Sequence, residues 1–386
     1  MTTLCGARVV TPTGVIDGGW AQVAGGVITA VGAAFPPADD QIDLGGAWLL
    51  PGYIDLHMHG GGGHDTTASP ADLAGAVAFH RANGTTRTLV SLVTAPLDTL
   101  AEQLGWIADR VAMGATPQGH VVGAHLEGPF LSLVRCGAQN PDYLLPPDRA
   151  DFARLVEAAR GCLRCVTVAP ELPGALDLIS DVVAAGAVAA IGHTDATYAD
   201  AQAAIAAGAR LATHLFNGMR PLHHREPGVI AAALGSDLAC EIINDGIHVH
   251  PAITALVARV RQRLVLITDA IDAAGVGDGE FVLGGQQVRV REGEARLTST
   301  GSLAGSTLTM DAAVRRAVFE CGLSIEAASA AASANPARVL GLGDHCGAIV
   351  AGQDADFVVL DDELRIVRVM TGGAWCDEEL TQLSGS

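Results

Sequence analysis

Histidine and acidic side chains recur directly after apolar runs in the central part of this chain. The set consists of His57, His59, His125, Glu127, His193, His214 and Asp269. Imidazole nitrogen and carboxylate oxygen together are typical ligands of Zn²⁺ and related divalent ions. Burying such groups beside one another is costly unless they bind a partner. The pattern therefore predicts a divalent metal centre.

The spacing of His57 and His59 supports this interpretation. Residues i and i+2 of a strand point to the same face, so both imidazoles can face one site. A histidine taken alone is as often a core residue with a satisfied hydrogen bond, and that alternative applies to each member of the set. The complete set, at the ends of five predicted strands, favours a metal centre.

The elements that would position these side chains alternate between strand and helix. Apolar strand-like runs cover residues 53–59, 87–92, 121–127, 163–169, 188–193, 211–216, 240–244 and 264–269. Helix-like stretches cover residues 70–82, 97–113, 148–159, 196–207 and 251–261, and further helices are expected at 306–321 and 325–340. Eight strand–helix units predict a parallel (β/α)8 barrel over residues 51–341. Barrel enzymes build their sites at the carboxyl ends of the strands, where the polar set falls.

Both ends of the chain consist of short apolar runs separated by turn residues. Strands are expected at residues 7–11, 20–23, 27–31, 41–44, 357–360 and 366–370. The economical arrangement is one small β-sandwich domain made of residues 1–50 and 342–386. The predicted fold class is thus α/β, a TIM-like (β/α)8 barrel with a small β-sandwich domain built from both termini.

The charge of the chain excludes several function classes. A formal net charge of −19 argues against a nucleic-acid surface, which needs a basic stripe, and against docking on anionic membranes. All 23 basic residues are arginine. The absence of lysine rules out Schiff-base catalysis, a Walker-type lysine and a carbamylated lysine that bridges two metal ions.

The cysteines and the N-terminal residues indicate the compartment. Eight cysteines are scattered along the chain, and Cys162 and Cys165 are the one close pair, so buried thiols are expected instead of a zinc knuckle. The first residues lack a basic segment followed by an apolar one, and no apolar run approaches the ~18 residues that span a bilayer. We therefore expect a soluble cytoplasmic protein.

Several segments resemble known enzymes. Residues 51–60 and 347–358 resemble the first barrel strand and the closing strand of the small domain in the amidohydrolase superfamily. Within that superfamily, four segments are similar to the N-acetylglucosamine-6-phosphate deacetylase family. They are residues 125–130, 191–196, 213–219 with 225–228 behind, and 245–249 followed by 268–270. The order of all four makes this resemblance specific over nearly the whole chain.

The resemblance implies a set of metal ligands. Glu127, His193 and His214 would hold the principal metal ion, and Glu127 would bridge to a second ion bound by His57 and His59. A bridging glutamate fits the absence of lysine. Family members that lack the first-strand histidines keep one ion, so this chain is expected to bind one or two divalent ions per subunit, with Zn²⁺ as the expected metal.

The resemblance also implies a reaction. Asp269 would take a proton from the attacking water and return it to the leaving amine, and His248 would help to polarise the acetyl carbonyl. The expected substrate is N-acetyl-D-glucosamine 6-phosphate, and the products are D-glucosamine 6-phosphate and acetate.

Further positions carry over as substrate contacts. Asn217 and the backbone of Gly218 would bind the phosphate together with Arg225, which the family typically offers from the neighbouring subunit, so a homodimer is implied. Leu303 and Ala304 lie where the family contacts the sugar. Gln139 stands where many members have a histidine that contacts substrate, which makes Gln139 a substrate-contact candidate and a departure from the family pattern.

Three alternatives remain open on sequence. The enzyme could prefer the galacto epimer, N-acetylgalactosamine 6-phosphate, because discrimination at one hydroxyl depends on pocket geometry. It could be another amide hydrolase of the superfamily, such as a dihydroorotase, hydantoinase or adenosine deaminase type, although the missing lysine and the phosphate-binding segment argue against these. A barrel without catalytic activity would be expected to have lost ligands, and here every ligand position is filled.

Overall fold

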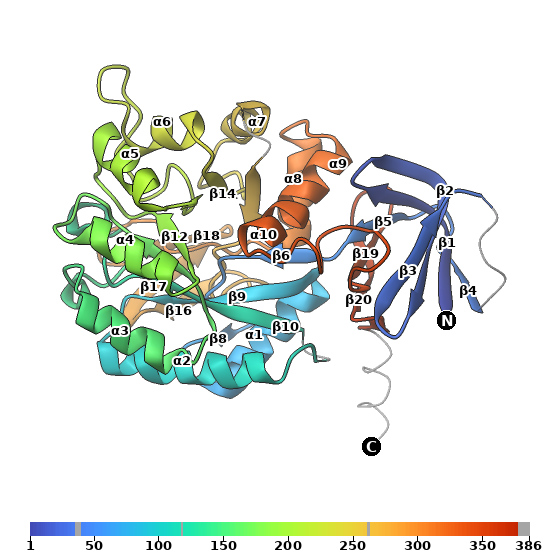
Figure 1. Cartoon of the computed structure of the whole chain (residues 1–386), viewed down its shortest axis with the longest axis horizontal. Helices are drawn as coiled ribbons and strands as arrows, with labels where there is room; N and C mark the ends of the chain where they lie inside the picture. Colours follow the sequence, from blue (N-terminus) through green and yellow to red (C-terminus); the bar gives the residue numbers. More distant parts are fainter. Residues whose placement is uncertain (35–39, 117–118, 261–262, 377–386) are drawn as a thin grey trace.

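The computed structural model describes residues 1–34, 40–116, 119–260 and 263–376. It places a barrel of strands and helices beside a separate β-sheet, and strands from both ends of the chain lie together in that sheet (Figure 1). Among the described residues no helix is long and apolar enough to cross a membrane.

The barrel contains eight parallel strands, as predicted. In chain order they are β6 (Tyr53–Asp55), β9 (Thr85–Val93), β10 (His120–Glu127), β11 (Leu163–Val168), β12 (Val188–Ile191), β13 (Leu211–Ala212), β14 (Ala239–Ile243) and β15 (Leu264–Ile267), and each pairs with the next. The first and last strands approach each other through a bridge between Met58 and Ala270, so the barrel is nearly closed. Strands β6, β12 and β13 end earlier than expected, and the site histidines lie in the segments that follow them, whereas β10 ends at Glu127 as predicted.

Helices lie between the strands on the outside of the barrel (Figure 1). They are α1 (Pro70–Ala82), α2 (Leu97–Ala112), α3 (Arg149–Ala158), α4 (Ala175–Ala184), α5 (Tyr198–Ala207), α6 (Gly228–Gly235), α7 (Pro251–Val260), α8 (Met310–Phe319), α9 (Ile325–Ala332) and α10 (Ala334–Val339). The bounds of α1 match the prediction because Ser69 caps the helix through the backbone N–H of Asp72 and Pro70 starts its first turn.

Two differences from the expected helices have local causes. Neither α4 nor α6 was predicted: glycine occupies the N-cap position of α4 and both ends of α6, and neither N-cap residue makes a side-chain hydrogen bond. The single helix expected at 325–340 is wrong, because the chain leaves helical geometry at Ser333 and restarts as α10. Pro336 then lies in the first turn of α10, where a missing backbone N–H is tolerated.

The second sheet contains β1 (Thr2–Thr11), β2 (Gly14–Ala24), β3 (Val27–Gly32), β4 (Asp40–Asp43), β5 (Trp48–Pro51), β19 (Phe357–Leu360), β20 (Ile366–Thr371) and β21 (Ala374–Trp375). The two ends of the chain meet where β5 pairs with β19. Strand β1 pairs with β2 on one side and, on the other, with β4 and then β5, so all eight strands are connected. Leu4, Ile28, Leu49 and Phe357 lie in its own apolar core.

A three-stranded antiparallel sheet after β15 was not predicted from the sequence. It consists of β16 (Gly279–Leu283), β17 (Gln286–Arg291) and β18 (Glu294–Leu297). Its buried Leu283 and Val288 share an apolar cluster with Val93, the last residue of barrel strand β9. This packing places the β16–β18 sheet over the end of the barrel where the polar strand ends meet.

Shorter elements complete the loops at that end. They are β7 (Gly60–Gly61), β8 (His64–Asp65) and the 3-10 turns η1 (Leu133–Arg135) and η2 (Pro141–Tyr143).

Candidate active site

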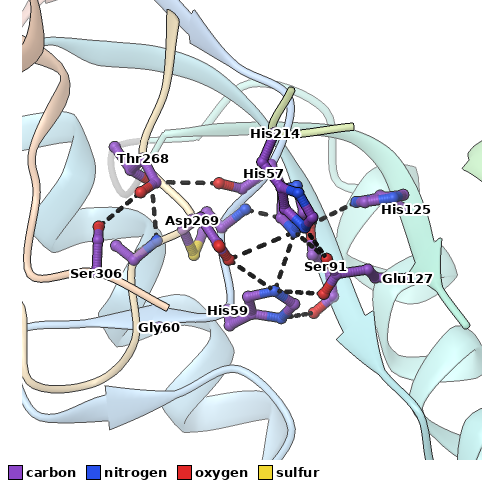
Figure 2. Close-up of polar contacts among 12 residues, drawn as sticks. His57, His59, Gly60, Ser91, His125, Glu127, His214, Thr268, Asp269 and Ser306 are labelled. Carbon is purple, nitrogen blue, oxygen red and sulfur yellow. Dashed lines mark hydrogen bonds and ion pairs between the residues drawn. The ribbon is translucent and has the colours of Figure 1, made fainter. Parts of the chain in front are cut away.

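Six side chains converge at the carboxyl ends of the barrel strands. They are His57, His59, Glu127, His193, His214 and Asp269, and all six are buried. Figure 2 shows His57 and His59, which follow β6, and Asp269, which follows β15, facing Glu127 at the end of β10. The ligating atoms fall into two groups that share Glu127, and within each group they lie within 4.8 Å of one another. The structure thus brings these six predicted residues together at one place.

The first group consists of His57, His59, Glu127 and Asp269. His59 Nε2 lies 3.2 Å from Glu127 Oε2 and 3.2 Å from Asp269 Oδ1. His57 Nε2 lies 3.3 Å from Glu127 Oε1 and 3.5 Å from Asp269 Oδ1. These distances suit donors arranged around one ion, because ligands about 2.0–2.2 Å from a zinc ion lie roughly 3–3.5 Å from each other.

The second group surrounds the first oxygen of Glu127. His193 Nε2 lies 3.0 Å and His214 Nε2 lies 2.9 Å from Glu127 Oε1. Oε1 of Glu127 therefore faces the second group and also His57, and Oε2 faces His59, so the carboxylate contacts both groups and could serve as a shared ligand.

The donor set fits a divalent cation. His57 Nε2 lies 3.1 Å from His59 Nε2, and His193 Nε2 lies 3.1 Å from His214 Nε2. Two imidazole nitrogens at this distance repel each other through their lone pairs unless a proton or a cation lies between them. Buried imidazoles and carboxylates with this arrangement match the preferences of zinc and related ions.

Hydrogen bonds on the far side of the rings decide which nitrogen faces the centre. His59 Nδ1 donates to the carbonyl of Ser91 (3.2 Å), and His193 Nδ1 donates to the carbonyl of Arg135 (3.0 Å). A carbonyl oxygen only accepts, so each Nδ1 carries the proton and each Nε2 keeps its lone pair for the centre. Such outer contacts orient metal-binding histidines.

The electric field in the site favours positive charge at its centre. Burial opposes a charged imidazole, yet Glu127 and Asp269 raise the pKa of His57 well above its ordinary value. Burial likewise opposes charge on His59, but its hydrogen bonds to Asp269 and Glu127 raise its pKa to about 9. Burial would raise the pKa of Glu127, but the charge of His57 and the hydrogen bonds from His193 and His214 hold it well below its usual range. Such a field attracts a divalent cation.

The backbone at three strand ends adopts an unusual conformation. His193, His214 and Asp269 have φ angles of 45°, 27° and 50°. Residues other than glycine rarely adopt positive φ, and such strained positions cluster at functional sites. Gly305 is needed beside Asp269, because a Cβ there would lie 2.9 Å from the carbonyl oxygen of Asp269, and Gly305 itself has a φ of +60°.

A buried polar network behind the centre was missed by the sequence analysis. Asp55 accepts the backbone N–H of His57 (3.1 Å) and the hydroxyl of Thr268 (2.6 Å). Ser306 Oγ donates to the carbonyl of Thr268 (2.6 Å), and Figure 2 shows Thr268 in contact with Ser306 on one side and His57 on the other. The available signal was a carboxylate two residues before the histidine pair inside an otherwise apolar strand.

His125 lies next to the centre without joining it. Its Nε2 bonds to Thr167 Oγ1 (2.8 Å) and its Nδ1 to Ser91 Oγ (3.0 Å), so both ring nitrogens are engaged. Burial holds its pKa well below the ordinary value. His125 is thus an uncharged side chain that borders the site, in agreement with its omission from the expected ligand set.

A cavity of about 240 Å³ opens above the centre, and most of the expected substrate residues line it. Its walls include His59, Glu127, Gln139, His193, His214, Asn217, Gly218, His248, Asp269, Leu303 and Gly305. His248 Nδ1 contacts Asp245 Oδ2 at 2.7 Å, and this bond raises the pKa of His248 although burial opposes it. His248 can therefore hold a proton on the ring nitrogen that Asp245 does not use.

Gly218 fits its place closely. It has a φ of +58°, and a Cβ there would lie 3.0 Å from His193 Nδ1. Because glycine has no Cβ, it adopts this positive φ without strain and avoids a close contact with His193, a candidate ligand.

Two expected substrate residues do not line the cavity. Ala304 is buried, and its backbone N–H bonds to the carbonyl of Ala295 (3.0 Å). Arg225 is exposed on the segment before α6, and its guanidinium contacts His224 Nε2 at 2.9 Å. A contact between Arg225 and a substrate in this cavity is thus not formed within the single chain.

Comparison with known proteins places the chain among close relatives. A model of the amidohydrolase family matches residues 48–377. The N-acetylgalactosamine-6-phosphate deacetylase of Escherichia coli O157:H7 is 39% identical over 369 residues, which cover 95% of this chain and 97% of that protein. The N-acetylglucosamine-6-phosphate deacetylase of Bacillus subtilis is 37% identical over 97% of each chain.

A solved structure resembles the whole fold. It is an aspartate-to-alanine variant of the N-acetyl-D-glucosamine-6-phosphate deacetylase from Mycobacterium smegmatis, in complex with N-acetyl-D-glucosamine 6-phosphate. Its TM-score is 0.93 and its sequence identity is 44%, over 97% of this chain and 99% of that chain.

Proposed function

Because this chain belongs to the amidohydrolase family, we propose that it is a metal-dependent deacetylase that converts N-acetyl-D-glucosamine 6-phosphate to D-glucosamine 6-phosphate and acetate. The observation that carries the proposal is the pair of ligand groups sharing Glu127 on the floor of the cavity. The similarity to N-acetylglucosamine-6-phosphate deacetylases over nearly the full chain supports this substrate.

The same residues define the proposed ligand roles. Glu127, His193 and His214 would hold one divalent ion, and His57, His59 and Glu127 would hold a second, with Zn²⁺ as the expected metal. A divalent ion there would lower the pKa of a bound water towards ~7 and polarise the amide carbonyl.

The chain's own residues then move the proton. Asp269 projects into the centre from the end of β15 and would accept a proton from the attacking water. It would return that proton to the amide nitrogen as the C–N bond breaks, so that the amine leaves neutral and the acetyl group leaves as acetic acid, which loses its proton to solvent to become acetate. His248, held by Asp245, would donate its ring proton towards the carbonyl oxygen, where negative charge develops.

Acetate release tests this function directly. We expect rapid release from N-acetylglucosamine 6-phosphate by the metal-loaded enzyme, little release from unphosphorylated N-acetylglucosamine, and loss of activity after chelation with recovery on adding Zn²⁺. The reason is that a divalent ion is needed to lower the pKa of the attacking water towards neutral pH. Undiminished activity in protein shown to be free of metal would contradict the proposal.

A deacetylase for the galacto epimer is the second candidate. The 39% identical Escherichia coli relative is an N-acetylgalactosamine-6-phosphate deacetylase. Measuring kcat/KM for both phosphorylated epimers under the same conditions decides between the two, because the ratio reports transition-state discrimination at one hydroxyl.

We place the phosphate at Asn217, Gly218 and Arg225, with Arg225 supplied by a neighbouring subunit of a homodimer. The cavity wall contains the first two, and the exposed Arg225 makes no ion pair among the described residues. We also assign the enzyme to the cytoplasm, which the eight free thiols support.

Arg225→Ala should raise KM for the phosphorylated sugar by about 10- to 100-fold, since a charge-assisted hydrogen bond contributes ~1.5–3 kcal/mol. Steady-state kinetics with phosphorylated and unphosphorylated sugars would show the effect on the phosphorylated sugar alone. Arg259→Ala, an exposed arginine on α7, is the control and should leave KM unchanged.

Mixing subunits tests the interface. If Arg225 reaches the site of the neighbouring subunit, a mixed dimer of Arg225→Ala and Asp269→Asn chains contains one site with both an intact Asp269 and an intact Arg225. At low substrate concentration such mixed dimers should regain part of the activity that each pure variant lacks. An equal rise of KM for both sugars, or no rise, would remove Arg225 from the phosphate site.

A further inference from the structure

Gln139 makes two short hydrogen bonds at the edge of the metal centre. Its side chain is buried in the cavity wall, with Oε1 accepting the backbone N–H of Thr94 (2.7 Å) and Nε2 donating to Glu127 Oε2 (2.7 Å). Both amide atoms of this side chain therefore contact protein groups, and one of those groups is the shared carboxylate.

The two hydrogen-bond partners determine the orientation of the Gln139 side-chain amide. A backbone N–H can only donate, so the atom that faces Thr94 must be the oxygen Oε1. The amide nitrogen then faces Glu127, and Glu127 Oε2 must be the acceptor. The backbone of Thr94, directly after β9, thus fixes Gln139 as a donor towards the carboxylate.

This bond restrains the orientation of the Glu127 carboxylate. Oε2, the oxygen held by Gln139, lies 3.2 Å from His59, while Oε1 faces His57, His193 and His214. Rotation of the carboxylate about its last bond would break the hydrogen bond to Gln139. The carboxylate plane is therefore held in the orientation that serves both ligand groups.

The loop that carries Gln139 is itself anchored. Gln286, at the start of β17, donates to the carbonyl of Ala138, the residue before Gln139 (2.5 Å). The same loop supplies the carbonyl of Arg135 that orients His193. The loop thus contacts one ligand of each kind, a carboxylate and an imidazole.

We infer that Gln139 is a positioning residue that holds Glu127 as a bridge and thereby sets the affinity of the His57–His59 site for the second divalent ion. This inference rests on the metal centre of the proposed function and deepens it. The group that binds is a divalent cation such as Zn²⁺, and Gln139 acts on it through Glu127.

Zn²⁺ titration of the metal-free protein tests the inference without substrate. Gln139→Met keeps the length of the side chain and removes both hydrogen-bonding atoms. Loss of a partner that orients a metal ligand typically costs 10–100-fold in metal affinity. We expect wild-type protein to bind two ions, and Gln139→Met to bind the second ion about 10- to 100-fold more weakly while the first changes by no more than a few-fold.

Gln286→Met is the matched control, because it makes the same substitution at a residue that tethers the same loop but contacts no ligand. It should leave both affinities near those of wild type. Gln139→Asn, one methylene too short to reach both Thr94 and Glu127, should show the same selective loss and carries the test if the Met variant does not fold.

Three results would overturn the inference: unchanged affinities in both Gln139 variants, an equal loss in Gln286→Met, or wild-type protein that saturates at one ion. Protein that binds two ions as expected but releases no acetate would overturn the proposed function and leave this inference standing.

Discussion

Asp269→Asn is expected to retain its metal and to lose kcat by about 10²- to 10⁴-fold, the usual contribution of a positioned acid–base group. Asparagine keeps the shape of the side chain and an oxygen towards His57 and His59, but it cannot accept a proton from water and return it to the leaving amine. Five other ligating residues remain to hold the ions. The measurements are kcat for acetate release and metal content per chain.

Asp272→Asn is the control for this prediction. Asp272 lies three residues further along the same loop and outside both ligand groups. Burial and the nearby Asp65 raise its pKa to about 6, so Asp272 is still mostly ionised at pH 7. Its replacement by an amide therefore removes a negative charge from the same loop and controls for the loss of charge alone. Turnover by Asp269→Asn within tenfold of wild type would show that another group moves the proton.

Glu127→Gln is expected to lose metal as well as activity. Glu127 is the one residue common to both ligand groups, and an amide nitrogen placed there cannot coordinate a cation. Removing a partner outside the ligand set already costs 10–100-fold in metal affinity, so we expect loss of the bridging carboxylate to weaken binding by more than about 100-fold. Competition with a chelator, followed by metal analysis, measures the change.

Glu241→Gln provides the comparison for this variant. Glu241 is a buried carboxylate whose Oε2 lies 3.5 Å from His57 Nδ1 and accepts the backbone N–H of His214, but it belongs to neither ligand group. It should weaken metal binding by no more than about 10- to 100-fold, the usual effect of losing a partner outside the ligand set, and so bind the ions more tightly than Glu127→Gln. If Glu127→Gln keeps two ions at wild-type affinity, the bridging role is wrong. Together with Asp269→Asn, this pair separates proton transfer from metal binding.

The residue types at the strand ends were sufficient to predict the centre. His57 and His59 share a face because strand side chains alternate, and the carboxyl ends of parallel barrel strands all meet at one end of the barrel. The eight strands and the bounds of α1 could also be predicted from the sequence. Apolar periodicity and the helix start at Ser69 and Pro70 each depend on only a few neighbouring residues. Such signals are local, so the sequence carries them without knowledge of the fold.

Other features depend on contacts between residues far apart in the chain. The β16–β18 sheet gains its buried face from packing against Val93, and no strong start signal marks α4 or α6. Whether Nδ1 or Nε2 of His59 faces the centre depends on the carbonyl of Ser91, which is brought there by the next barrel strand. Local propensity carries no information on these partners.

By itself, then, the sequence predicted that these polar residues gather at the ends of barrel strands, because strand periodicity and the order of the elements are short-range patterns, and the family resemblance added the proposed ligand set. Only the tertiary structure decided what Gln139 does. Its position in the sequence indicated a substrate contact, but its amide is turned by the backbone of Thr94 and bonded to Glu127. An amide can donate or accept with equal ease, so its role is set by the groups that the fold places on either side of it.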